Sequence, residues 1–221
     1  MLLNSNIESD IHLIGHRLVR CAHQCDGIEN DPENGILPRC LVLETDNRTD
    51  EQGCAIIGMN PGRASAQETK WHEIHGVTYG DVVDYWKAHV GDKNRYYFQL
   101  RKLSDQLGFT GPLLWTELAK CQSAAGVGIP PLQTFRTCSS EYLTEELRLC
   151  PEDWPLIAVG REAHKALSYL YPNRIVIGVP HPTGSWGNFS RLFDHSSQLF
   201  PRFSSMVDSA LTSQTTVWLD T

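Results

Sequence analysis

Hydrophobic residues along this 221-residue chain form short continuous runs that alternate with stretches of helical spacing. Four runs are typical of buried strands, namely residues 53–58, 112–115, 155–160 and 174–179. Apolar residues recur at the helical period in four other stretches, namely residues 80–89, 94–107, 139–149 and 162–171. Alternation of this kind predicts right-handed βαβ units and a parallel sheet covered by helices on both faces. We therefore expect an α/β fold, a three-layer αβα sandwich with a central four-stranded parallel sheet.

The two ends of the chain fall outside this regular pattern. Residues 11–24 have helical spacing, whereas residues 26–52 are rich in Asp, Glu, Asn, Gly and Pro and predict a loop-rich segment with one short strand at 40–44. Residues 212–221 are polar and predict a loose tail. These features predict a single domain over residues 1–211, followed by that tail.

Composition and charge narrow the location and the partners. No apolar stretch approaches the roughly 18 residues of a membrane-spanning helix, and the N-terminus lacks a basic region followed by a continuous apolar segment. We expect a monomeric, cytoplasmic protein with no membrane partner. The formal net charge of −7 opposes indiscriminate binding to nucleic acid, which depends on Lys and Arg. Any contact with DNA must therefore use a local basic surface.

Two of the predicted strands lead into polar motifs. The run at 53–58 continues into Met59-Asn60-Pro61-Gly62, and the run at 174–179 continues into His181-Pro182-Thr183. Each motif alone is typical of a β-turn, because Asn, Pro and Gly dominate turns for conformational reasons. In a parallel sheet, however, both would reach the edge where the carboxyl ends of the strands open and where ligands bind. An Asn and a His at that edge are the smallest set of side chains that could cleave the bond between a base and its sugar.

Seven cysteines in a chain without a secretory signal favour metal binding, reactivity or core packing over disulfides. Cys21 and Cys25 lie four residues apart in a helical pattern, so both thiols can face one way. Cys121 and Cys138 flank a Gly/Pro-rich loop. Four thiolates from these positions would suit a [4Fe-4S] cluster or zinc. The other three cysteines lie beside apolar residues and are interpreted as small core residues.

The motifs, taken together and in order, resemble the uracil-DNA glycosylase superfamily over roughly residues 11–200. The first two segments are Gly58-Met59-Asn60-Pro61-Gly62, similar to the first motif of the single-strand-selective and mismatch-specific branches, and Gly76-Val77-Thr78-Tyr79-Gly80, similar to the segment that supplies a ring to stack on the extruded base. The third runs from Leu113 to Cys121 and resembles the base-reading strand of the iron-sulfur branch. The likeness continues through Cys138 with Tyr142-Leu143, through Ile157-Ala158-Val159-Gly160 with Ala163, and ends at His181-Pro182-Thr183, which is usually His-Pro-Ser.

The resemblance implies a DNA glycosylase that flips a damaged or modified base out of DNA. It implies catalytic roles for Asn60, which would hold a water, and for His181, which would donate to the base oxygen O2. It also implies base contacts from the residues Gly58, Met59, Pro61, Gly62 and Tyr79. Finally, it favours a [4Fe-4S] cluster on Cys21, Cys25, Cys121 and Cys138, with zinc as the alternative, although the first pair has three intervening residues where that branch usually has two.

Glu117 is the most informative departure from the family pattern. The aligned residue is usually Asn, whose amide can donate to O4 of uracil and accept from N3–H, whereas a carboxylate only accepts. Glu117 could accept from the N4 amine of cytosine and, if burial keeps it protonated, donate to N3. We therefore expect a modified cytosine, such as a hypermodified phage base, rather than uracil. An alignment slip to Thr116, and a helix-capping or salt-bridged Glu117, remain open alternatives.

Contacts with DNA are predicted at two places. Arg161 and Lys165 follow Gly160 at a predicted helix N-terminus, where a phosphate can bind. Ser185 and Trp186 extend the His181 loop, and Trp186 could fill the space that the flipped nucleotide leaves. The Lys93–Lys102 segment, with Tyr96 and Tyr97, could serve phosphates and stacking, but an amphipathic helix with a solvated face is the favoured interpretation.

Several functional alternatives stay open. No Lys occupies either motif, so we expect a monofunctional hydrolase that leaves an abasic site. A uracil-DNA glycosylase of base-excision repair is one alternative. A non-catalytic iron-sulfur or zinc protein that binds nucleic acid is another.

Overall fold

The computed structural model describes residues 7–39, 41–184, 188–192 and 199–219 of the chain. Its helices are α1 (Ile7–Leu18), α2 (Ala66–His75), α3 (Tyr79–Tyr85), α4 (Arg95–Gln106), α5 (Leu132–Cys138), α6 (Thr144–Leu149), α7 (Arg161–Leu170), α8 (Asn188–Arg191) and α9 (Leu199–Ser213). A wider helical turn, Trp86–Val90, continues α3, another, Ser139–Leu143, joins α5 to α6, and a short 3₁₀ turn covers Pro32–Asn34. The strands are β1 (Ile28–Glu29), β2 (Val42–Glu44), β3 (Cys54–Gly58), β4 (Leu113–Glu117), β5 (Gln122–Ser123), β6 (Leu156–Val159), β7 (Val176–Val179) and β8 (Val217–Trp218).

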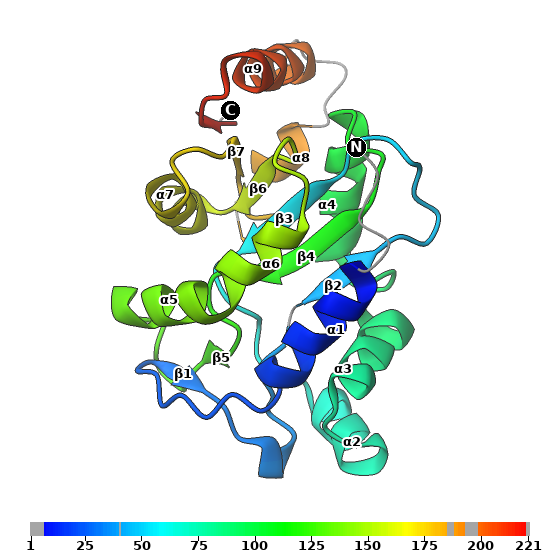
Figure 1. The fold of residues 1–221 in the computed structure, drawn as a ribbon, viewed down its shortest axis with the longest axis vertical. Coiled ribbons are helices and arrows are strands. Elements are labelled where there is room, and N and C mark those ends of the chain that lie inside the picture. The colour runs from blue at the N-terminus through cyan, green and yellow to red at the C-terminus, as the bar shows by residue number, and fades with distance from the viewer. Residues whose placement is uncertain (1–6, 40, 185–187, 193–198, 220–221) are drawn as a thin grey trace.

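The main sheet has six strands in the order β2-β4-β3-β6-β7-β8 (Figure 1). Every neighbouring pair is parallel except β2 and β4, which are antiparallel. The four predicted parallel strands form its centre, so the α/β class is confirmed, whereas the strand number was wrong. The sequence did not indicate that the predicted strand at 40–44 joins this sheet as an edge, nor that a sixth strand follows β7.

The sixth strand comes from the segment that we expected to be a loose tail. Val217 and Trp218 pair with Ile177 and Gly178 of β7, and the Leu219 amide donates to the Gly178 carbonyl at 2.7 Å. Gly178 makes room for this strand because an added Cβ would overlap the Trp218 ring. A strand of two residues within a polar segment is too short to show an apolar period, and backbone pairing with β7 holds it.

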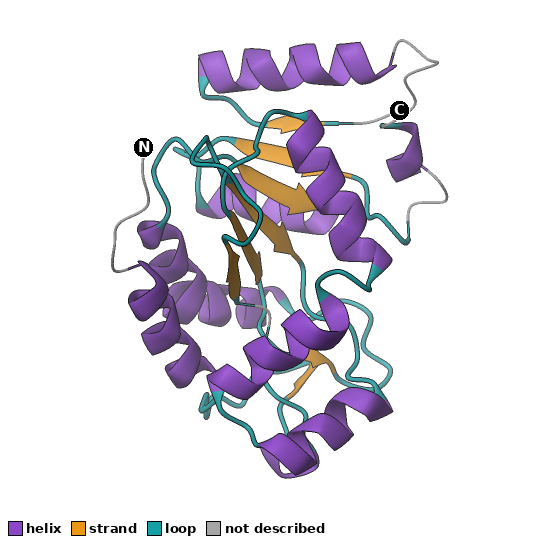
Figure 2. Ribbon diagram, turned by 90° about the vertical axis from the view of Figure 1, so that its right-hand side faces the viewer, coloured by secondary structure: helices purple, strands orange, loops and turns teal. Residues whose placement is uncertain are grey.

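Helices pack on both faces of the sheet (Figure 2). Along β3 the side chains alternate, so Ala55 and Ile57 join the core beneath α1, α3 and α7, whereas Cys54 and Ile56 join the core beneath α4, α8 and α9. All five residues of β3 and of β4 are buried. Burial on both faces explains why these strands read as continuous apolar runs in the sequence.

Two helix predictions need correction. The helix predicted for residues 11–24 begins at Ile7 and ends at Leu18, so Cys21 and Cys25 lie in the loop that follows and not on a helix face. Helix α2 was not predicted because His72 is its one buried residue, which leaves no apolar stripe to recognise. Within the described ranges, no helix is both long and apolar enough to cross a membrane.

Candidate active site

The carboxyl ends of four parallel strands open into one cavity of about 680 Å³. Glu117 ends β4, Asn60 follows β3, Val159 ends β6 and His181 follows β7, and all four residues line this cavity. Asn60 and His181 therefore line the same cavity, although β6 lies between their strands β3 and β7. Two strand spacings separate β3 from β7 by roughly 10 Å.

The side-chain amide of Asn60 is oriented by its neighbours. Its Nδ2 donates to Ser123 Oγ at 3.0 Å, with longer contacts to the carbonyls of Pro61 at 3.4 Å and Cys121 at 3.5 Å. Carbonyl oxygens accept only, so the nitrogen must face them. The amide oxygen Oδ1 is thereby directed away from this group of acceptors. Such an oxygen can hold a water molecule but is too weak a base to ionise it.

The hydrogen bonds of His181 define its tautomer. The backbone N–H of Thr183 donates to His181 Nδ1 at 3.3 Å, so Nδ1 is an acceptor and the neutral ring carries its proton on Nε2. Partial burial of the ring lowers the pKa of His181 below its ordinary value, which favours this neutral form. Nε2–H is therefore the donor that His181 can offer to a ligand.

Glu117 places a carboxyl group at the bottom of the cavity. The residue is 7% exposed, and its Oε2 is buried without a hydrogen-bond partner. Burial raises the pKa of Glu117 to about 8, against smaller lowering effects of Lys120 and Arg39. At neutral pH the side chain is therefore mostly a protonated acid, which can both donate and accept a hydrogen bond. Oε2 packs against Gly58, and the rest of the Glu117 side chain lines the cavity, where a ligand would meet it.

Thr116 lies on the other side of strand β4 and does not line the cavity. Its hydroxyl donates to Glu146 Oε2 at 2.6 Å, and Lys120 Nζ pairs with the same carboxylate at 2.7 Å. Neighbouring residues of a strand point to opposite faces, so only one of the pair can face a ligand. Thr116, the alternative candidate for base recognition, therefore does not reach the cavity, and Glu117 is the residue of β4 that lines it.

The loop after β3 forms one wall of the cavity. Its lining residues are Gly58, Met59, Asn60, Pro61 and Gly62. Backbone N–H groups of Leu118 and Ala119 donate to the carbonyls of Gly58 and Met59, both at 3.0 Å. Arg39 donates to the Gly62 carbonyl and pairs with Glu68. The loop is thus fixed to the end of β4 on one side and to a buried guanidinium on the other.

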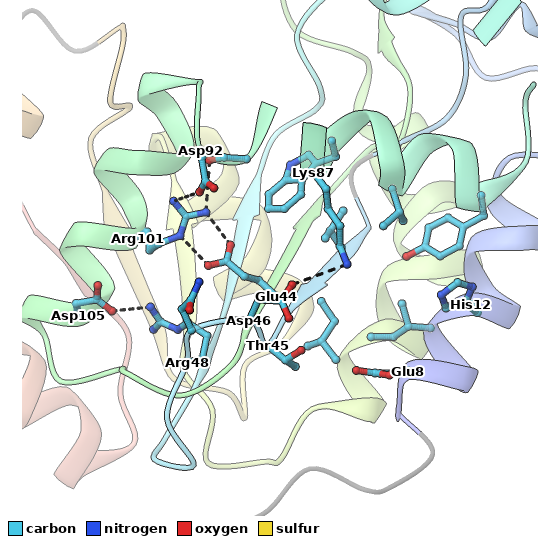
Figure 3. A pocket seen from close by; sticks show the side chains of 18 residues that line it. Glu8, His12, Glu44, Thr45, Asp46, Arg48, Lys87, Asp92, Arg101 and Asp105 are labelled. Carbon is cyan, nitrogen blue, oxygen red and sulfur yellow. Dashed lines mark hydrogen bonds and ion pairs between the residues drawn. The ribbon is translucent and has the colours of Figure 1, made fainter. Parts of the chain in front are cut away.

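Tyr79, the expected stacking ring, is a core residue. It is 2% exposed, its hydroxyl donates to the Leu41 carbonyl at 2.7 Å, and its ring packs directly on Gly15 of α1. Tyr79 borders a different cavity of about 570 Å³, shown in Figure 3. It lies away from Asn60 and His181 because it begins α3, where Thr78 caps the helix and turns the ring inward.

The cavity of Figure 3 is lined by ion pairs. Arg101 makes a two-pronged contact with Glu44 at 2.7 and 2.8 Å, Arg48 pairs with Asp105 at 2.7 Å, and Lys87 approaches Asp46 at 3.9 Å. Each of its Lys and Arg side chains thus has a carboxylate beside it. This arrangement offers little positive charge to a phosphate, so we place the candidate site at the other cavity.

Tyr96 and Tyr97 are aromatic residues of the cavity wall. Both line the 680 Å³ cavity, and the Tyr96 ring centroid lies 5.3 Å from that of His181. The amphipathic-helix interpretation was preferred to a stacking role for their segment, because the two rings occupy only the first turn of α4. The outer wall adds further rings and polar groups that the sequence reasoning missed, namely Gln67, His72, Tyr85, Trp86, His89 and Asn94. No short motif marks these residues.

The predicted DNA contacts have mixed outcomes. Ser185 and Trp186 lie outside the described residues. Arg161 begins α7 with its guanidinium 5.0 Å from the Trp218 ring centroid, and Lys165 pairs with Glu162 on the surface. Neither lines the cavity. Arg63, which follows directly on the first motif, does line it, and its side chain is 61% exposed. It was missed because the motif was considered to end at Gly62.

The four cysteines proposed as ligands lie in one region. Burial raises the pKa of the Cys121 thiol above its ordinary value, and the neighbouring thiols of Cys138, Cys21 and Cys25 raise it further. All four are free, with Cys121 and Cys138 buried. Four sulfur donors match the chemistry of a [4Fe-4S] cluster or zinc. In the described part of the chain no three potential ligands are close enough together to count as a metal-binding group.

Comparison of the sequence with known protein families and with curated proteins finds no match. The resemblance noted in the sequence therefore rests on the short motifs alone.

Proposed function

We propose that this protein is a monofunctional DNA glycosylase that removes a modified cytosine. The observation that carries the proposal is the convergence of Asn60, His181 and a buried, unpartnered Glu117 on one cavity at the carboxyl edge of a parallel sheet. That edge is where open α/β sheets bind their ligands. Asn60, His181 and Glu117 can together meet three needs of glycosidic hydrolysis. These are a positioned water, a hydrogen-bond donor to the leaving base and a side chain that recognises the base edge.

Hydrolysis breaks the bond between C1′ of the sugar and N1 of the base. The sugar develops oxocarbenium character, so a water held by Asn60 Oδ1 needs only to be positioned to add at C1′. The bonding electrons leave with the base, where negative charge gathers at O2 and N3. His181 Nε2–H donates to O2, and protonated Glu117 donates to N3. The added water loses a proton to solvent as the abasic sugar forms.

The electrostatic state of Glu117 supports cytosine over uracil. Uracil presents N3–H and the acceptor O4, whereas cytosine presents the acceptor N3 and the N4 amine. A protonated Glu117 can donate to N3 of cytosine and accept from N4, but with its two oxygens exchanged it can also donate to O4 of uracil and accept from N3–H, so the preference rests on the departure of the base. Cytosine is the poorer leaving group, so a proton donor at N3 also assists its departure.

The size of the cavity supports a substituted base. A volume of about 680 Å³ lies within the usual range of small-molecule sites, roughly 300–1,000 Å³. A bare pyrimidine ring fills only a small part of it. The outer wall of Gln67, His72, His89 and Asn94 offers hydrogen-bonding groups to a substituent on the ring. Hypermodified bases of phage genomes fit this description, which makes defence against foreign DNA a coherent role.

No Lys side chain is among the described residues that line the cavity. A Schiff base with the sugar therefore has no amine in reach among those residues, which supports simple hydrolysis. If the four thiols hold a [4Fe-4S] cluster, it would tie the loop after α1 to the segments after β4 and in α5. The proposal assigns no chemical step to such a cluster.

A substrate panel tests the proposal. Purified protein would be incubated with single- and double-stranded oligonucleotides that carry uracil, cytosine, 5-hydroxymethylcytosine or its glucosylated form, and abasic sites would be cut with alkali. We expect strand cleavage at a modified cytosine and weaker or no cleavage at uracil. Cleavage at uracil alone would favour the uracil-DNA glycosylase, and intact strands throughout would favour a non-catalytic nucleic-acid-binding protein.

A further inference from the structure

The amide of Asn60 makes its shortest hydrogen bond to a side chain outside both motifs. Ser123 Oγ lies 3.0 Å from Asn60 Nδ2, and it is the nearest of the three acceptors around that nitrogen. Ser123 is also the only acceptor among them that a substitution can remove, because the other two are backbone carbonyls. Ser123 does not line the cavity. Any effect of this serine on a ligand must therefore pass through another residue.

Ser123 is itself held in a fixed position. It forms β5 with Gln122, and β5 pairs with β1 in the register Ile28 to Ser123 and Glu29 to Gln122. This two-stranded sheet lies apart from the main sheet in Figure 1. Gln122 Nε2 donates to Glu29 at 2.9 Å, and its Oε1 accepts from the Ala64 amide at 2.7 Å. The strand that carries Ser123 is thus tied to the same loop that carries Asn60.

The direction of the Asn60 amide decides whether it can hold a water. With Nδ2 toward Ser123, Oδ1 is available as an acceptor. If the amide turned over, Oδ1 would face the carbonyls of Pro61 and Cys121, and Nδ2 would take its place. An NH₂ group cannot accept from the attacking water. The two carbonyls oppose that rotation, because they only accept, and the Ser123 hydroxyl adds the shortest contact that keeps the amide in place.

We propose that Ser123 is a positioning residue for hydrolysis, which holds the Asn60 amide so that its oxygen faces the water. This inference rests on the proposed function, since it assigns a role within the same reaction. It predicts that Ser123 affects the chemical step and not the binding of DNA, because its hydroxyl touches Asn60 and lies outside the cavity lining.

The test compares Ser123→Ala with the parent protein under single-turnover conditions on the best substrate of the panel. We expect the excision rate to fall between roughly ten- and a hundredfold, the cost of a small misplacement of a reacting group, with an unchanged Kd for the oligonucleotide. Ser140→Ala is the matched control, because that exposed hydroxyl donates to Thr137 within its own helix. It should keep the parent rate.

A shape-matched pair keeps the test decisive if Ser123→Ala folds poorly. Ser123→Thr retains a hydroxyl and should retain most of the rate, whereas Ser123→Val has nearly the same shape without the hydroxyl and should lose as much as Ser123→Ala. Equal rates for Thr and Val would overturn the proposal.

A double substitution separates positioning from a general structural effect. In an Asn60→Ala background, Ser123→Ala should cause no further loss, because the amide that it orients is absent. An equal loss in both backgrounds would overturn the positioning role while leaving the glycosylase activity intact. A parent protein without any excision would instead refute the proposed function.

Discussion

The carboxyl group of Glu117 lies directly against the Cα of Gly58. These two residues pair with each other at the ends of the parallel strands β4 and β3. A Cβ added at position 58 would overlap all three atoms of that carboxyl group. The glycine is therefore required by the close approach of the acid. The first motif and strand β4 are thus packed together through Gly58 and Glu117, which lie 59 positions apart in the sequence.

Gly58→Ala should displace the Glu117 carboxyl group and disturb the floor of the cavity. Because Glu117 is buried between strands, it has little room to move, and overpacking of this kind typically costs about 1–3 kcal/mol. We expect a lower melting temperature together with a reduced rate on the preferred base. Gly128→Ala is the matched control, since an added Cβ there meets open space. A Gly58→Ala protein as stable and active as the parent would refute the close packing.

Glu117→Asn should change the base preference. An amide can pair with O4 and N3–H of uracil at any pH, whereas it has no acidic proton to give to N3 of a departing cytosine. We expect a gain of uracil excision and a loss on modified cytosine, measured as the ratio of single-turnover rates on the two substrates. Changes of polar contacts at one base edge typically cost about 1–3 kcal/mol, so the ratio should shift by roughly five- to 160-fold. An unchanged ratio would remove Glu117 from base recognition.

Glu117→Gln should alter how stability depends on pH. The folded-state pKa of about 8 lies above the ordinary value of 4.5, so between these values the folded protein holds a proton that the unfolded chain releases. The parent therefore loses unfolding free energy as pH rises through this window, by about 1.4 kcal/mol for each pH unit from this group alone. Glutamine does not titrate, so the unfolding free energy of the variant, relative to that of the parent, should rise by that amount for each pH unit. Urea unfolding at pH 5 to 9 measures the difference, and parallel curves would contradict the raised pKa.

Cys138→Ser should reduce metal binding by the protein. If four thiolates hold a [4Fe-4S] cluster, the parent should contain iron and absorb visible light at about 400 nm. Removal of one ligand should diminish both the iron content and this absorbance. Cys54→Ala is the matched control, because Cys54 lies in the core beneath α4 rather than with the other thiols. Zinc without visible absorbance would favour the alternative metal. Equal iron contents in Cys138→Ser and the parent would exclude Cys138 as a ligand.

The sequence predicted the central strands because their apolar runs are buried on both faces and end at recognisable turns. The same reasoning brought Asn60 and His181 to one edge, since parallel strands share their carboxyl edge, whereas Glu117 came from the family resemblance. It did not reveal that β6 lies between the two motif strands. Strand order depends on how crossovers pack, and no local pattern along the chain encodes it.

Errors arose where one side chain's direction mattered. Tyr79 and Tyr96 are both aromatic residues beside a helix start, and only packing against Gly15 in one case and beside His181 in the other separates a core ring from a cavity ring. The role of Ser123 could not be predicted from the sequence for a similar reason. A lone serine carries no signal until the fold brings its hydroxyl within 3.0 Å of the Asn60 amide.

The most direct test of the central claim is the single-turnover excision rate of Asn60→Ala and His181→Ala on the base that the parent removes fastest. Each group is proposed to act on an opposite end of one glycosidic bond, and loss of one such preorganised group typically costs about a hundredfold or more in rate. We predict losses of at least that size in both variants, with folding and DNA affinity retained. Excision at the parent rate in either variant would contradict the account.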